Sequence, residues 1–178
     1  MIMRIESWQI FEVLKAPLRQ WQGIIFHCTA NNPGSEYSQT HLMGSTIDAD
    51  HRKPEADGGR GFNNGMGYQF LINRMDGIIE TGDRWLEQLD GAHCPEDGKN
   101  HTHIGISFVG NGDIEKPTME QMKSLKALFD ELRKKLGFGI FNVFFHRDFD
   151  THGKTCPGNL LNLKIIRKYL GGLNESYL

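Results

Sequence analysis

The chain has 178 residues, which is a usual size for one domain with one hydrophobic core. Lys and Arg total 20 and Asp and Glu total 22, and the net charge of −2 without a block of like charges argues against nucleic-acid binding. No stretch approaches the roughly 18 to 20 consecutive apolar residues that a membrane-spanning helix requires. We therefore expect a single domain over residues 1–178, with no membrane insertion and no nucleic-acid partner.

Residues 1–22 form an N-terminal extension in which charged residues interrupt the apolar ones. They lack the apolar core and the small-residue cleavage site of a secretory signal. The extension therefore predicts a protein made in the cytoplasm without a signal peptide. Its apolar side chains are expected to pack on a sheet as an extra strand or helix, and they are Trp8, Ile10, Phe11, Val13 and Leu14.

The next part of the chain predicts a strand, a short helix and a loop. Residues 23–28 are an apolar run after a glycine, which is typical of a buried strand. A weak helical pattern over residues 39–52 ends before Pro54. Residues 55–67 are rich in Gly, Asn and Asp, which indicates a surface loop.

A hairpin and a central strand follow. Residues 67–73 and 78–80 flank Asp76-Gly77, a dipeptide that favours a tight turn between two strands. Residues 104–110 alternate bulky and small side chains. This alternation predicts a central strand on which another part of the protein packs closely.

The clearest predicted element is a helix that begins after Thr118 and ends at Gly137. Thr118 and Gln121 have the spacing of a capping box, and glycine commonly follows the last turn of a helix. Residues 141–146 then predict a buried strand, and residues 159–170 a closing helix. The helix after Thr118 carries one apolar stripe, formed by Met122, Leu125, Phe129, Leu132 and Leu136.

The order of these elements predicts the fold class. Strands mixed with helices, and a hairpin among them, are typical of an α/β fold with a central mixed β-sheet flanked by helices. No internal repeat or low-complexity tract is present in the sequence. We expect the domain to be a monomer.

Three cysteines, Cys28, Cys94 and Cys156, are an odd number in a chain too large to need disulfides for its stability. This favours free or metal-bound thiols over a Cys28–Cys94 disulfide. Because neighbouring residues of a strand point to opposite faces, Cys28 is expected to point away from His27 and into the core.

Two histidines, His27 and His146, stand where predicted strands end, and Cys156 follows His146 after nine intervening residues. The carboxyl ends of strands are where a sheet presents side chains to a ligand. Zinc takes three or four N, S or O ligands, and a catalytic zinc keeps one position for water. These residues therefore form a candidate zinc site, although a single histidine in such a place is more often structural.

Other histidines permit further interpretations. His101 and His103 would share one face of a strand and could bind a second metal with His93 or Cys94. The remaining histidines of the first half, His41 and His51, have polar neighbours, and this predicts an exposed helix face.

Five short blocks between residues 23 and 158 resemble the zinc-dependent N-acetylmuramoyl-L-alanine amidases, a family that includes phage amidase endolysins and peptidoglycan recognition proteins. The blocks occur in the order of the family. They are Phe26-His27-Cys28-Thr29-Ala30, Gly67-Tyr68-Gln69-Phe70-Leu71-Ile72 with Asp76-Gly77, Gly91-Ala92-His93, Asn100-His101-Thr102-His103-Ile104-Gly105-Ile106, and His146-Arg147-Asp148 with Lys154-Thr155-Cys156-Pro157-Gly158.

The resemblance implies the family's fold, one Zn²⁺ per chain and a peptidoglycan or muropeptide substrate. It implies zinc ligands at His27, His146 and Cys156. It also implies catalytic roles for Tyr68, which would orient water, and Lys154, which would stabilise an oxyanion. Substrate contacts are implied for His93, Asn100 and His101.

The sequence departs from the family pattern in two places. Gln69 replaces the usual histidine of its block. The segment between His146 and Cys156 is two residues longer than in typical members, and His152 within it is an alternative third ligand. The Lys-x-Cys-Pro-Gly context favours Cys156.

The implied activity is hydrolysis of the amide bond between N-acetylmuramic acid and L-alanine, in a cell-wall-lytic, bacteriolytic phage endolysin. Alternatives are a non-catalytic peptidoglycan-binding module, a cytosolic muropeptide-recycling amidase and an effector secreted by another route. A zinc peptidase of another class is disfavoured, because no His-Glu-x-x-His motif is present. The loops at residues 55–66 and 90–100 are expected to contribute to specificity.

Overall fold

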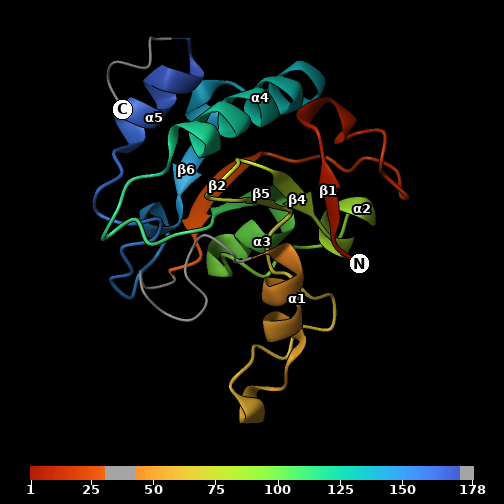
Figure 1. Cartoon of the computed structure of the whole chain (residues 1–178). Helices are drawn as coiled ribbons and strands as arrows, with labels where there is room; N and C mark the ends of the chain where they lie inside the picture. The colour runs from red at the N-terminus through yellow and green to blue at the C-terminus, as the bar shows by residue number, and fades with distance from the viewer. Residues whose placement is uncertain (31–42, 173–178) are drawn as a thin grey trace.

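The computed structural model describes residues 1–30 and 43–172 of the chain. Their framework is a six-stranded sheet with the strand order β1-β4-β3-β5-β2-β6 (Figure 1). β3, β5, β2 and β6 run parallel, whereas β4 pairs antiparallel with both β1 and β3. The predicted α/β fold with a central mixed sheet is therefore confirmed. The strands are Met3–Ile5 (β1), Gly23–Cys28 (β2), Phe70–Ile72 (β3), Ile79–Thr81 (β4), His103–Phe108 (β5) and Val143–Phe145 (β6).

β2 lies between β5 and β6 and is covered on both faces. All of its residues from Gly23 to His27 are buried, as expected for a parallel strand between two layers. In the register of the sheet, Ile24 lies beside Ile104 and His27 beside Ser107. Because the parallel strands end at one edge of the sheet, the residues that follow β2, β5 and β6 come together there.

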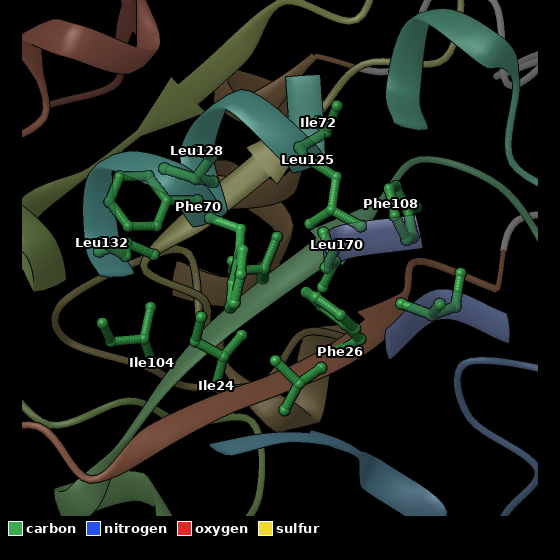
Figure 2. Packing of buried hydrophobic residues seen from close by; sticks show 14 of the residues in the cluster. Ile24, Phe26, Phe70, Ile72, Ile104, Phe108, Leu125, Leu128, Leu132 and Leu170 are labelled. Atoms are coloured by element: carbon green, nitrogen blue, oxygen red, sulfur yellow. The ribbon is translucent and has the colours of Figure 1, made fainter. Parts of the chain in front are cut away.

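Helix α4, Met119–Leu136, covers one face of the sheet (Figure 1). The Thr118 hydroxyl accepts from Gln121 N, the Gln121 side chain accepts from Thr118 N, and Gly137 ends the helix with a positive φ of 75°. This confirms the predicted capping box and terminator. The apolar stripe of α4 packs on strand side chains such as Phe26 and Phe70 (Figure 2).

The predicted hairpin is confirmed, with strands shorter than expected. β3 pairs antiparallel with β4, and Gly77 takes a positive φ of 69° in the turn between them. Asp76 Oδ1 accepts a hydrogen bond from Ile78 N at 3.0 Å. The N-terminal extension packs on the sheet as expected: β1 adds to the edge of β4, and Ile10 is buried in the main core.

The closing helix begins later than predicted. α5 spans Leu163–Leu170, because the Asn162 side chain accepts hydrogen bonds from Lys164 N and Ile165 N and caps the helix there. The weak helical signal after residue 39 corresponds to α1, Gly44–Arg52, on the other side of the sheet from α4 (Figure 1). Residues 39–42 of that prediction lie outside the described residues.

Short helical turns connect the main elements. They are α2 (Asp83–Leu86), α3 (Lys99–Thr102), and the 3₁₀ turns η1 (Ser7–Gln9), η2 (Glu55–Asp57), η3 (Glu96–Gly98), η4 (Ile140–Asn142) and η5 (His146–Asp148). Within the described ranges, the longest helix is too polar for a membrane span, and none of the others qualifies.

Candidate metal centre and cavity

The three predicted ligands, His27, His146 and Cys156, come together at the carboxyl edge of the sheet. One potential ligand atom from each lies within 4.8 Å of the others. Cys156 Sγ is 3.6 Å from His27 Nδ1, and the two imidazole rings are 4.7 Å apart between centroids. His27, which is more than 100 positions from the other two in the sequence, thus joins them in one cluster of soft and borderline ligands of the kind that zinc prefers.

Each ligand is placed by a different element. His27 lies on β2, beside Ser107 of β5. Phe26 precedes His27, Phe108 follows Ser107, and both belong to the core cluster beneath α4. Because neighbouring residues of a strand point to opposite faces, His27 faces away from α4. His146 begins η5 directly after β6. Cys156 lies in a loop, and its backbone carbonyl oxygen accepts a hydrogen bond from Arg147 N at 2.9 Å.

The surroundings of the two histidines, burial above all, favour neutral imidazoles, which are the form that binds a metal. Burial lowers the pKa of His27 well below 6.5, with further contributions from His93 and His146. Burial also lowers the pKa of His146, followed by the positive charge of Lys154. His146 Nε2 is buried without a hydrogen-bond partner, so a metal ion would satisfy an otherwise unpaired atom. The residues present fit a zinc ion.

The position of Cys28 differs from the prediction. Its side chain is only partly buried and forms a hydrogen bond with Cys156, so the expectation that it points into the core is wrong. The physical reason is that β2 ends at Cys28, where the Cys156 loop crosses the edge of the sheet. The hydrogen bond to Cys28, and then burial, raise the pKa of the Cys156 thiol. All three cysteines are free, as predicted.

A cavity of about 400 Å³ opens over this cluster. Both predicted catalytic residues, Tyr68 and Lys154, line it. The two loops expected to contribute to specificity also line the cavity. Residues 55–66 contribute Arg60 and Phe62, and residues 90–100 contribute His93 and Pro95. The remaining lining residues are His27, Cys28, Thr29, Ala30, His51, Ala92, His146 and Cys156.

Tyr68 and Lys154 differ in their surroundings. The Tyr68 ring lies 5.2 Å from the His27 ring, and burial, followed by the neighbouring Cys156, raises the pKa of its phenol. Tyr68 is therefore a hydrogen-bond donor at neutral pH. The Lys154 side chain is 49% exposed, and its Nζ lies 3.5 Å from Asp150 and 4.0 Å from Glu96. Its positive charge stands at the cavity wall.

His51 is not on the exposed helix face that its polar neighbours predicted. Its Nδ1 accepts a hydrogen bond from Gly67 N at 2.9 Å, and its ring lies 6.0 Å from that of Tyr68. The last turn of α1 therefore faces the cavity, and His51 contacts the segment just before β3 that contains Tyr68. His41 lies outside the described residues.

The three residues with predicted substrate contacts occupy different places. His93 is buried and lines the cavity. The Asn100 side chain accepts hydrogen bonds from the backbone N–H groups of His93 and Cys94, at 2.7 and 2.8 Å. His101 is exposed on α3 and lies 2.9 Å from Asp90 Oδ1. Neither Asn100 nor His101 is among the described residues that line the cavity, and their substrate contacts stay predictions.

The second metal site that the sequence left open is not formed. His103 is buried between the rings of Phe144 and Phe149, and His101 lies on the surface. In the described parts of the chain, neither belongs to a group of possible metal ligands. The alternative third ligand, His152, is exposed and also belongs to no such group.

Sequence reasoning did not identify Glu96. Glu96 Oε2 lies 3.6 Å from His146 Nε2 and accepts a hydrogen bond from the Cys94 thiol at 3.2 Å. Cys94, Glu96 and His146 therefore form a second group of possible ligands that shares His146 with the first. The only signal in the sequence was the position of Glu96 in the loop that follows the Gly91-Ala92-His93 block.

Comparisons with known proteins identify the family. Solved structures with the same fold include the endolysin LysCS, an N-acetylmuramoyl-L-alanine amidase from Clostridium intestinale, with 30% identity, 85% of this chain and 84% of that chain covered, and a TM-score of 0.65. Drosophila PGRP-LB is 28% identical over 85% of each chain, with a TM-score of 0.61. No curated protein matches significantly. The family model of N-acetylmuramoyl-L-alanine amidase matches residues 17–159, and the chain therefore belongs to this family.

Proposed function

We propose that the protein is a zinc-dependent N-acetylmuramoyl-L-alanine amidase, which hydrolyses the amide bond between N-acetylmuramic acid and L-alanine in bacterial peptidoglycan. One Zn²⁺ is held by His27, His146 and Cys156. The observation that carries this proposal is the convergence of these three side chains with Tyr68 and Lys154 on one cavity.

The surroundings of each residue suit one part of amide hydrolysis. When bound, zinc supplies a Lewis acid for the amide carbonyl and lowers the pKa of water toward neutrality. Tyr68, whose phenol stays protonated, donates a hydrogen bond that orients water or the amide. Lys154 places a positive charge beside the oxygen on which negative charge develops. His93 lines the same cavity and is predicted to face the substrate.

The biological role that we propose is a cell-wall-lytic endolysin of phage origin, acting as a monomer on the wall after release from the cytoplasm. Its support is the similarity to the endolysin LysCS. A cytosolic recycling amidase would use the same residues but would prefer soluble anhydro-muropeptides to intact sacculi. Comparing the rates on these two substrates distinguishes the roles.

The decisive experiment is mass spectrometry of purified peptidoglycan after incubation with the protein. The expected result is release of intact stem peptides with a free L-alanine amino terminus, abolished by a chelator and restored by zinc. Cys156→Ser serves as the inactive control, and His152→Ala, in the same loop but exposed, as the matched active one.

The same experiment tests a second candidate, a non-catalytic peptidoglycan-binding module. The fold that the chain shares with the peptidoglycan recognition protein PGRP-LB is compatible with this alternative. Binding of muropeptides without cleavage of any bond, in the presence of zinc, would contradict the proposed amidase and support the binding module. Cleavage that a chelator does not affect would contradict the role of the metal.

A further inference from the structure

A chain of two hydrogen bonds runs from the predicted zinc ligand His27 into the protein interior. His27 Nε2 lies 3.0 Å from His93 Nδ1, and His93 Nε2 lies 3.2 Å from the backbone carbonyl oxygen of His103. The rings of His27 and His93 meet edge to face, with centroids 4.9 Å apart. We infer that His93 is a positioning residue, which holds His27 in the tautomer that presents Nδ1 to the metal. This inference rests on the proposed zinc site.

The donor and acceptor of each of these two hydrogen bonds follow from the contact with the His103 carbonyl oxygen. A carbonyl oxygen only accepts hydrogen bonds, so His93 Nε2 must carry the proton of that contact. A neutral imidazole has one N–H, which leaves His93 Nδ1 as an acceptor. His27 Nε2 must then be the donor of the 3.0 Å contact. The lone pair of neutral His27 consequently lies on Nδ1, the atom that is 3.6 Å from Cys156 Sγ.

The position of the His93 ring is fixed by close packing. A Cβ atom at Gly105 or at Gly91 would lie 2.4 Å from His93 Cδ2, so both glycines leave room for this ring. The alternation of bulky and small residues over 104–110 predicted that another part of the protein packs closely on this strand. That part is His93, whose ring lies against Gly105. Asn100 holds the backbone of His93 in place by accepting from its N–H. A rotation of the ring would also break its contacts with His27 and with the His103 carbonyl.

Contacts of this kind are important for metal binding. A histidine ligand usually donates its second N–H to an outer partner, and loss of that partner typically costs about 10- to 100-fold in metal affinity. Here the partner is a buried imidazole. Without it, His27 could adopt the tautomer with the proton on Nδ1, which must be lost or moved before a metal binds.

The test compares three variants by competition of the purified protein with a fluorescent zinc chelator. His93→Leu removes the acceptor and is expected to weaken zinc binding about 10- to 100-fold. His93→Asn keeps an acceptor oxygen near the position of Nδ1 and is expected to recover most of the affinity. His103→Asn is the matched control, since it removes a buried imidazole but keeps the backbone carbonyl that accepts the hydrogen bond from His93.

A second measurement does not depend on zinc or on the stability of the variants. Long-range ¹H–¹⁵N correlation spectra of the zinc-free wild-type protein report which ring nitrogen of His27 carries the proton. The inference expects the proton on Nε2. A proton on Nδ1 would overturn it. If the wild-type protein binds no zinc, the proposed metal centre is wrong, and the tautomer still decides this inference.

The variants also separate the positioning role from the predicted substrate contact. A folded His93→Leu protein with wild-type zinc affinity and only a raised KM would show that His93 contacts substrate, and the inference would be wrong. Weaker zinc binding in His93→Leu, with partial rescue in His93→Asn and no change in His103→Asn, supports the positioning role.

Discussion

The Thr155 hydroxyl donates a 2.6 Å hydrogen bond to Asp113 Oδ2, which ties the residue before Cys156 to the segment after β5. The other carboxylate oxygen accepts from Asn159 N at 2.7 Å. These two hydrogen bonds hold the pKa of Asp113 below its usual value. One carboxylate therefore connects both ends of the Cys156 loop to the carboxyl edge of the sheet.

Replacement of Asp113 by alanine is expected to weaken zinc binding and to lower the free energy of unfolding by about 1 kcal/mol, because two hydrogen bonds to an exposed carboxylate are lost. Urea unfolding and zinc competition measure the two effects. Asp57→Ala, which removes an exposed carboxylate on η2, is the control. Equal zinc affinity in the Asp113 and Asp57 variants would show that the loop keeps its position without this carboxylate.

Cys156→Ser is expected to lose most bound zinc, because a hydroxyl is a much poorer zinc ligand than a thiolate. His152→Ala is expected to keep one zinc per chain, since His152 is exposed and belongs to neither group of possible ligands in the described residues. Elemental analysis of the dialysed proteins measures both. Stoichiometric zinc in the serine variant, together with its loss in the alanine variant, would identify His152 as the third ligand.

Lys154→Ala is expected to keep zinc and to lose about two to three orders of magnitude in kcat, by analogy with the loss of an oxyanion donor. The side chain is half-exposed, so the fold should not depend on it. Lys99→Ala, which removes a half-buried lysine of α3 that does not line the cavity, is the control. The measurement is the rate of stem-peptide release from peptidoglycan. Wild-type turnover in the Lys154 variant would refute the assigned role.

Acid is expected to destabilise the zinc-free protein in a window set partly by His103. Burial lowers the pKa of His103 from 6.5 to about 4, with Lys99 adding to the shift. Between these pH values the unfolded chain binds more protons than the folded one, so protonation favours unfolding. His103 therefore does not lower the free energy of unfolding above about pH 6.5, and it lowers it progressively as the pH falls toward 4.

Urea unfolding across this pH range measures the slope. His103→Asn should show a smaller loss of stability on acidification than the wild-type protein, because the variant has one fewer buried imidazole to protonate. The same slope in both proteins would mean that other groups cause the loss.

Short-range interactions explain what could be predicted from the sequence. The capping box at Thr118 and the Asp76-Gly77 turn depend on neighbouring residues, and the structure confirms both. β2 was predicted with its observed bounds because a continuous apolar run is typical of a strand buried on both faces. The helix start at Leu163 was missed, because a capping asparagine outweighed a longer apolar pattern.

The sequence by itself determined the fold class and, through its short family blocks, the candidate residues of the metal centre. Only the tertiary structure decided their neighbours. The contact of Cys28 with Cys156 depends on where β2 ends and where a distant loop crosses it. The approach of Glu96 to His146 and of His93 to His27 depends on how the segment before β5 folds over the sheet. Such contacts join residues 50 to 130 positions apart, and no local pattern encodes them.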